Sequence, residues 1–232
     1  MGGLRNLKAK LQYFRCSILN QPLTYLPEPP KTITFIIETV LRQFIDRYLI
    51  LSNEEMAMLT ARIQVRHFAR RATLVQEGEK EQYLNLVVKG ILRKFFHKGK
   101  QEVITQLASE GSLVSSSVSF LSAAPSLYVI EALEPVTVLS ISKESLDELY
   151  TKMPKMERLG RIITTELYLQ KEQWEQDHIC FDVKQRFMKF VHEQGDLLRR
   201  VPQKYIASYL NIKPETFSRL KHHLRTKPEL IA

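Results

Sequence analysis

Residues 201–224 (VPQKYIASYLNIKPETFSRLKHHL) predict two short helices around a tight corner. Asn211 tolerates the left-handed backbone that ends a helix. Pro202 and Pro214 suit first helical turns, because the N–H that a proline lacks has no partner there. Two such helices joined by a short turn form a helix-turn-helix, whose second helix enters the major groove of DNA. The apolar residues at helical spacing are Ile206, Ala207 and Leu210 in the first helix, and Phe217, Leu220 and Leu224 in the second.

The charge distribution separates a DNA reader from an ordinary helical hairpin with a solvated basic face. Residues 181–232 hold 11 Lys and Arg against 5 Asp and Glu, a net +6 of the whole chain's +9. A basic balance concentrated on this segment is the electrostatic footprint of a phosphate-backbone partner. It therefore favours DNA.

The segment IASYLNIKPETFSRLKHHL resembles the helix-turn-helix of the catabolite-activator (Crp–Fnr) family of bacterial transcription regulators, which runs I-A-x-x-L-G-I-S-x-E-T-x-S-R. Asn211 replaces the glycine of the turn, and Pro214 stands where several members carry a base-contacting arginine. The resemblance implies a homodimer on double-stranded DNA with a roughly palindromic site, and RNA polymerase as a further partner. The matching positions are Ile206, Ala207, Leu210, Ile212, Glu215, Thr216, Ser218 and Arg219.

The second helix carries the residues expected to contact DNA. Arg219 and Glu215 are assigned to base edges, the arginine to guanine O6 and N7 and the glutamate to the cytosine amino group. Thr216 and Ser218 are assigned to bases or phosphates. The side chains expected to position the DNA backbone are Lys204, Lys213, Lys221 and His222.

Upstream, residues 64–142 change to a β pattern. Short apolar runs separated by glycines are typical of an antiparallel sandwich or barrel. The pieces LVVKGILRKFF (86–96) and IEALEPVTVLSIS (130–142) resemble the cyclic-nucleotide-binding domain that precedes the helix-turn-helix in the Crp–Fnr family. The expected fold class is therefore α+β: an N-terminal β-roll (a double-stranded β-helix or jelly roll), a long helix, and a C-terminal helix-turn-helix, winged-helix-like domain.

The resemblance also implies a sensory site, from which two charges are missing. In nucleotide-binding relatives, a glutamate for the ribose aligns near Ser116 and an arginine for the phosphate aligns at Pro125 or Ser126. Serine cannot replace the bidentate fork of arginine on a phosphate, so cyclic AMP is not expected to be the effector. Either the hydroxyls cradle an unknown small anion or the segment is a polar turn without a ligand. The candidate effector-binding residues are Ser115, Ser116, Ser117 and Ser119.

Residues 154–178 carry an apolar stripe near the 3.5-residue period of coiled coils. Such a stripe can pack on the β-roll of its own chain. A helix this long favours a partner helix, and the Crp–Fnr family pairs its two subunits here. The expected dimer interface consists of Met156, Leu159, Ile163, Leu167 and Trp174.

Composition excludes several other classes of protein. No apolar run reaches the roughly 18–20 residues of a membrane span, and Cys16 and Cys180 make neither a disulfide framework nor a thiolate cluster, which indicates a cytoplasmic protein. No nucleophile elbow accompanies the serines, and His222 and His223 are adjacent, so they point in different directions. We therefore assign no catalytic residue, metal or cofactor, and expect a protein that is not an enzyme.

Four segments are expected along the chain. The alternative to a DNA-binding regulator is a ligand-sensing or scaffolding module without DNA-binding activity. The segments are a basic, loosely ordered extension over residues 1–30, a sensory β-roll domain over 31–150, a dimerisation helix over 151–180 and a helix-turn-helix domain over 181–232.

Overall fold

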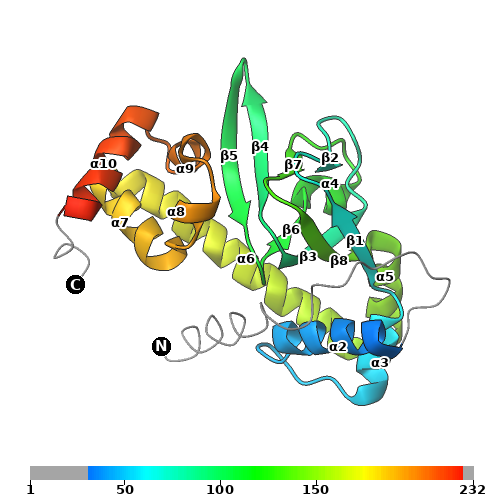
Figure 1. Ribbon diagram of the computed structural model, residues 1–232. Coiled ribbons are helices and arrows are strands. Elements are labelled where there is room, and N and C mark those ends of the chain that lie inside the picture. Colours follow the sequence, from blue (N-terminus) through cyan, green and yellow to red (C-terminus); the bar gives the residue numbers. More distant parts are fainter. Residues whose placement is uncertain (1–30, 227–232) are drawn as a thin grey trace. The chain divides into compact units, whose positions relative to one another are not determined.

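The computed structural model describes residues 31–226 (Figure 1), so the extension expected over 1–30 lies outside the described residues. The residues from Ile36 onward form one compact unit. The domain boundaries expected at 150 and 180 stay predictions. Near the start, α2 (Lys31–Ile45) is followed by α3 (Asn53–Thr60). A capping box begins α3, because the Ser52 hydroxyl accepts the Glu55 N–H and the Glu55 carboxylate accepts the Ser52 N–H.

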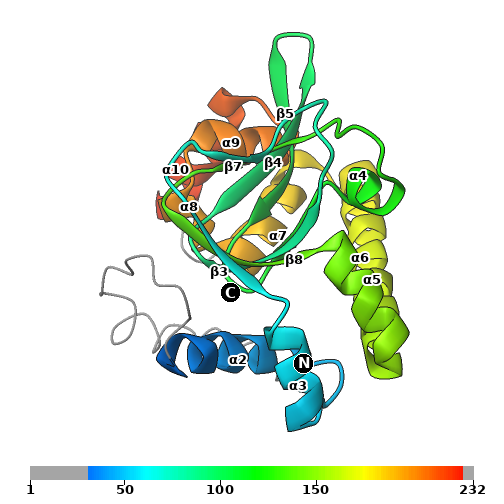
Figure 2. The same cartoon turned by 90° about the vertical axis from the view of Figure 1, so that its right-hand side faces the viewer.

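Eight strands form the β-roll over the span that the glycine-punctuated pattern predicts. They make two antiparallel four-stranded sheets, in the orders β1-β8-β3-β6 and β2-β7-β4-β5, which face each other in Figure 2. Val87, Ile130 and Val138 fill the space between the sheets and are at most 1% exposed. The strands are β1 (Gln64–Phe68), β2 (Thr73–Val75), β3 (Tyr83–Lys89), β4 (Leu92–Lys98), β5 (Gln101–Ala108), β6 (Leu113–Val114), β7 (Val129–Ala132) and β8 (Val136–Ser142).

Two of the glycines occupy turns whose backbone conformation favours glycine over other residues. Gly90 joins β3 to β4 with a φ of 94°, and a Cβ there would lie 2.6 Å from the carbonyl oxygen of Pro135. Only glycine fits this close approach. Gly99 has a φ of 62° in the two-residue turn of the β4–β5 hairpin, where positive φ matches the twist of the paired strands.

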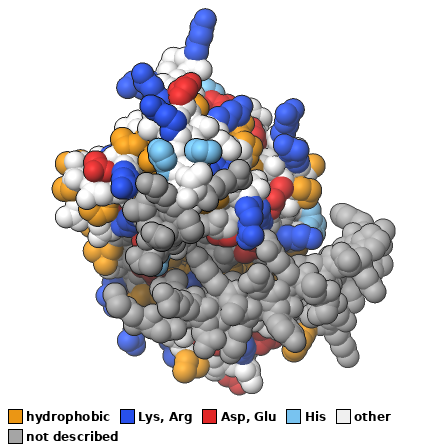
Figure 3. All heavy atoms as spheres, turned by 60° about the vertical axis from the view of Figure 1, so that its left-hand side comes forward, with side chains coloured by type: hydrophobic (Ala, Val, Ile, Leu, Met, Phe, Trp, Pro, Cys, Tyr) orange, Lys and Arg blue, Asp and Glu red, His pale blue; other side chains and the backbone are white. Residues whose placement is uncertain are grey.

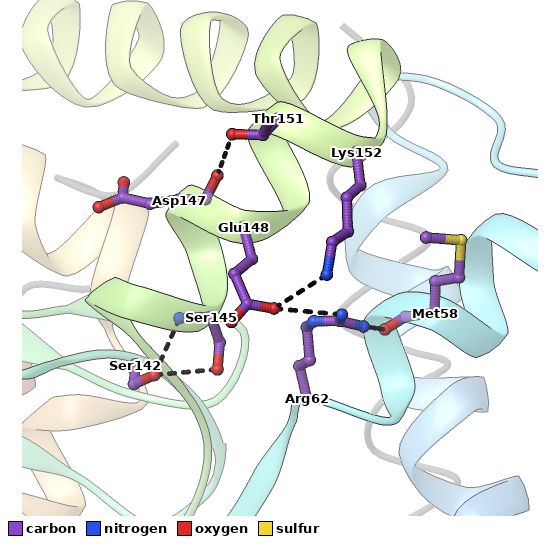
Figure 4. Close-up of polar contacts among 8 residues, drawn as sticks. All are labelled: Met58, Arg62, Ser142, Ser145, Asp147, Glu148, Thr151 and Lys152. Atoms are coloured by element: carbon purple, nitrogen blue, oxygen red, sulfur yellow. Dashed lines mark hydrogen bonds and ion pairs between the residues drawn. The ribbon is translucent and has the colours of Figure 1, made fainter.

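Two short helices belong to the β-roll region, α4 (Ser117–Ser122) and α5 (Lys143–Lys152), of which α5 was not expected from the sequence. The hydroxyl of Ser142 caps α5 by accepting the N–H of Ser145, at 3.1 Å. Arg62, which follows α3, forms an ion pair with Glu148 of α5 at 3.3 Å, and Figure 4 shows both contacts. The ion pair holds α5 beside the end of α3.

The C-terminal part is helical, and the α+β fold class is confirmed. The long helix α6 (Pro154–Cys180) has Pro154 in its first turn, and α7 begins after an Asp182 cap. Asn211 has the left-handed φ of 53° that was expected between the last two helices. The helices after α6 are α7 (Val183–Gln194), α8 (Leu197–Arg200), α9 (Gln203–Tyr209) and α10 (Pro214–Thr226).

Candidate nucleic-acid interface and sensory site

The corner between α9 and α10 is a Schellman motif. The N–H of Ile212 donates to the Ala207 carbonyl oxygen and the N–H of Asn211 donates to that of Ser208, both at 3.0 Å. These bonds satisfy the last carbonyls of α9 around a left-handed residue. The corner therefore sets the direction in which α10 leaves α9.

The apolar face of α10 fixes its rotation. Phe217 is fully buried, and its ring meets that of Phe187 of α7 edge-on at 5.5 Å between centroids. Ile206 and Ala207 of α9 belong to the same buried cluster. With this face buried, the opposite face of α10 points away from the core, where a groove-binding helix needs its polar side chains.

Most of the predicted DNA-contacting residues lie on this free surface, where Lys, Arg and His side chains gather in Figure 3. Thr216 and Lys221 are half-buried, and the Lys221 ammonium lies 3.4 Å from the Leu198 carbonyl oxygen. Lys221 is therefore partly engaged inside its own chain. The exposed members of the set are Lys204, Lys213, Glu215, Ser218, Arg219 and His222.

The first helix of the pair, α9, is docked on the edge of β5. The Ser208 hydroxyl donates to the Glu102 carbonyl oxygen at 3.0 Å and accepts the Ile104 N–H at 3.1 Å. β5 is the last strand of its sheet, so these groups have no strand beside them. One serine thus satisfies two backbone groups that a neighbouring strand would otherwise bind.

Charged contacts reinforce this docking. Arg93 of β4 forms ion pairs with Glu102 and Glu131, and its guanidinium lies 4.2 Å from the centre of the Tyr205 ring of α9. Hydrogen bonds from Arg93 hold the pKa of Glu102 below its ordinary value. Arg200, the last residue of α8, forms ion pairs with Glu110 and Glu134 of the β-roll region. A buried, fully paired arginine makes a docking geometry specific.

One apolar cluster spans the β-roll and the C-terminal helices. Ile104 and Phe95 of the β4–β5 hairpin belong to the same buried cluster as Phe187, Ile206 and Phe217. The helix-turn-helix therefore shares its core with the sensory β-roll, although the boundary predicted at residue 180 divides the two.

The two positions that align with the missing nucleotide-binding charges lie together. The hydroxyl oxygens of Ser116 and Ser126 are 2.8 Å apart, and both residues are buried. Ser119 accepts the Glu81 N–H at 2.9 Å, whereas Ser117 is exposed. Among the described residues, the Ser115 hydroxyl has no hydrogen-bond partner. Two of the four candidate hydroxyls, those of Ser116 and Ser119, are thus bonded within the chain.

Sequence reasoning missed two charged residues at this site, Glu81 and Lys94. The Glu81 carboxylate accepts the N–H of Tyr83 at 3.0 Å and that of Ser116 at 3.3 Å, and burial raises its pKa. The ammonium of Lys94 donates to the Ser115 carbonyl oxygen at 2.8 Å and lies 4.5 Å from the centre of the Tyr128 ring. An acid of the chain itself therefore occupies the N–H group at the start of α4.

The expected dimer stripe on α6 is largely used inside the chain. Met156 and Leu159 are 4% and 3% exposed, and the Trp174 ring lies 3.9 Å from that of His178. Ile163 is half-buried, and Leu167 is 38% exposed. The spacing correctly identified an apolar face, and much of it is covered by the same chain.

A different face of α6 presents exposed apolar side chains. Leu169 and Ile179 are 59% and 76% exposed, and Ile162 is half-buried. These three lie seven and ten residues apart, which places them at a and d positions of one heptad pattern. This face is available to a second helix.

Two negative findings concern residues 31–226. No group of three His, Cys, Asp or Glu side chains in that range is placed to hold a metal ion. No helix within it is long and apolar enough to cross a membrane.

Residues 65–153 match the family model of the cyclic nucleotide-binding domain. The match includes the sensory site and all of the β-roll except the first residue of β1. No match was found among curated protein sequences.

Three solved structures have a similar fold at low sequence identity. The c-di-GMP responsive global regulator CLP of Xanthomonas campestris is 14% identical, with a TM-score of 0.61, over 76% of this chain and 93% of that one. FixK2 of Bradyrhizobium japonicum is 19% identical, with a TM-score of 0.62, over 72% and 86%. A putative cyclic nucleotide binding protein of Ruegeria pomeroyi is 21% identical, with a TM-score of 0.59, over 82% and 88%. These likenesses confirm the arrangement of β-roll, long helix and C-terminal helices as a known fold.

Lys94→Met should flatten the dependence of stability on pH in mildly alkaline solution. Burial lowers the pKa of Lys94 from 10.5 to about 8, so between these values the unfolded chain binds more protons than the folded one. The free energy of unfolding therefore rises with pH across this window, by about 3 kcal/mol in total, and below the window Lys94 adds no pH dependence because both states bind the proton. Urea unfolding from about pH 7 to about pH 10 measures the slope. Lys80→Met, at an exposed position, is the control; a slope equal in wild type and Lys94→Met would contradict this assignment.

Proposed function

We propose that this chain is a sequence-specific DNA-binding transcription regulator of the Crp–Fnr type that acts as a homodimer. The observation that carries the proposal is the surface of α10, where Arg219 and Glu215 are exposed one turn apart while Phe217 anchors the helix. In the major groove, Arg219 would donate two hydrogen bonds to a guanine and Glu215 would accept one from a cytosine amino group. RNA polymerase is the further partner that such a role implies.

Backbone contacts would come from the basic residues around this pair. Lys204, Lys213 and His222 are exposed and need no rearrangement to meet phosphates. Lys221 would first release the Leu198 carbonyl oxygen. A scaffolding module without DNA binding remains the alternative, and the free basic surface of α10 argues against it.

For the sensory site, we infer that cyclic AMP is not the effector. A cyclic phosphate would meet Pro125 or Ser126 where an arginine is required, and its ribose would meet Ser116 where a glutamate is required. The Glu81 carboxylate already accepts the Ser116 N–H. Two anions at one helix start repel each other. The buried Ser115 hydroxyl has no hydrogen-bond partner among the described residues, so it could bond to some other small effector.

The homodimer would form through α6. Its exposed face, defined by Ile162, Leu169 and Ile179, can meet the same face of a second copy about a two-fold axis. Two recognition helices would then read half-sites about 34 Å apart, one turn of DNA. This arrangement explains why a roughly palindromic site is expected.

Arg219→Ala should weaken binding to a specific site by about 1–3 kcal/mol and relax discrimination at one base pair. The specific duplex is obtained by selection from a randomised pool, and binding is compared with a random duplex. Lys213→Ala is the matched control, which should weaken both equally and lower the salt slope by about one. An unchanged ratio of specific to random binding in Arg219→Ala would exclude the base-reading role.

Cyclic AMP at millimolar concentration should leave both the melting temperature and the DNA affinity unchanged. A ligand that binds only the native state stabilises it by about 2.7 kcal/mol at a hundred times its dissociation constant, so binding would be visible. Differential scanning fluorimetry provides the measurement. A clear upward shift of the melting temperature would show that the serines bind the nucleotide.

Leu169→Asp should convert a dimer into a monomer. Two like charges would face each other at the axis without counter-charges, and operator binding would weaken because a single half-site binds poorly. Ile163→Asp is a less clear test, because Ile163 lines a pocket with Tyr48 and Leu113 of its own chain. Sedimentation distinguishes the states, with Ile50→Asp as the control at a 77% exposed apolar position outside α6. A wild type that is monomeric at high concentration would remove α6 from this role.

A further inference from the structure

The tip of the β4–β5 hairpin is a second basic element on the side of the protein that carries α9. The five residues at the tip, 97–101 (HKGKQ), are all exposed. His97 lies 2.9 Å from Glu77, which leaves Lys98 and Lys100 on either side of Gly99. Within the described part of the chain, no acidic side chain forms an ion pair with either lysine. Figures 1 and 3 show the hairpin projecting at the top of each view.

The docking on β5 ties this tip to the helix-turn-helix. Ser208 of α9 binds the backbone of Glu102, and Lys100 is only two residues further along the strand, or about 7 Å at 3.4 Å per residue. The carboxylate of Glu102, which lies next to this docking contact, is paired with Arg93 and so does not neutralise Lys100. The Lys204 ammonium lies 4.8 Å from the centre of the Tyr205 ring, which contacts Arg93 in turn. The N-terminal end of α9 and the hairpin tip thus belong to one rigidly connected basic surface.

The position of α9 indicates what this surface meets. In a helix-turn-helix the first helix crosses the phosphate backbone while the second lies in the groove. An element held beside α9, as the hairpin is through Ser208, therefore lies near that backbone, beyond the bases that α10 reads. Two lysines without acidic partners match a row of phosphates in charge.

We infer that the β4–β5 hairpin tip is a second DNA-binding element, in which Lys98 and Lys100 contact phosphates that flank the recognised site. The inference rests on the proposed function and extends it: the sensory domain itself would contribute to DNA affinity. Because phosphate contacts carry no base information, the hairpin would raise affinity without changing sequence preference.

The double variant Lys98→Ala/Lys100→Ala tests the inference by its salt dependence. The slope of log K against log salt should fall by about two, since each lost phosphate contact removes about 0.9. The ratio of dissociation constants between 200 and 50 mM salt should accordingly fall about tenfold. The ratio of specific to random binding should stay at the wild-type value.

Duplex length supplies an independent readout. Wild type should bind a selected duplex of about 40 base pairs more tightly than one of about 22 that covers only two half-sites. The double variant should bind both alike. Lys143→Ala/Lys152→Ala is the charge-matched control on α5, which Figure 1 shows on the far side of the β-roll from α9, and it should keep the wild-type slope and length dependence.

The outcomes separate this inference from the proposed function. If wild type binds DNA and the hairpin variant keeps its salt slope and its length dependence, the inference is wrong while the proposed function stands. If wild type binds neither selected nor random duplexes, both are wrong. A slope that falls equally in the α5 control would show a general effect of net charge and would also overturn the inference.

Discussion

The docking of α9 on the open edge of β5 is the contact on which the arrangement of the C-terminal helices depends. An edge strand presents backbone groups that need partners, and the Ser208 hydroxyl satisfies those of Glu102 and Ile104 together. The apolar cluster beside it joins Ile104 to Phe217 of the recognition helix. The core of the helix-turn-helix is consequently continuous with buried residues of the β4–β5 hairpin, and this shared packing orients α10 relative to the β-roll.

Strand β4 connects the candidate sensory site with the docked helix α9. Successive side chains of a strand point to opposite faces, so Arg93 reaches Tyr205 of α9 while Lys94 reaches the Ser115 carbonyl oxygen at the sensory site. Lys94 is the chain neighbour of Arg93, so a change of charge or bonding at Lys94 occurs next to a residue that docks α9. One peptide bond therefore joins a residue at the candidate sensory site to a residue that contacts α9.

Local signals made the helix-turn-helix and the span of the β-roll predictable. Pro214 and Asn211 determine backbone geometry by themselves, and the helix cap at Ser52 depends on a neighbour three residues away. Glu81 and Lys94 were missed because each lies in an ordinary β pattern, and only the packing of the sheets buries them beside Ser115. The cap of α5 by Ser142 was a local signal that could have been found.

The α6 stripe shows the limit of periodicity. Spacing identified an apolar face at Met156 and Leu159, but it contains no information on what covers that face. In the structure the same chain covers both residues, and the exposed apolar residues Leu169 and Ile179 lie on another face. Choosing between these faces required the three-dimensional contacts.

The central claim, that the β-roll and the C-terminal helices share one core, is tested most directly by urea unfolding followed with two probes. Trp174 is the chain's single tryptophan and lies 6.4 Å from the Tyr209 ring, so its fluorescence reports the junction of α6 and α9, whereas far-UV circular dichroism reports the whole chain. The account predicts one transition with coincident midpoints. In a Ser208→Ala variant both midpoints should fall together, and the free energy of unfolding should drop by about 1–3 kcal/mol because two part-buried backbone groups lose their partner. Two separated transitions in wild type, with only the fluorescence midpoint shifted by Ser208→Ala, would contradict it.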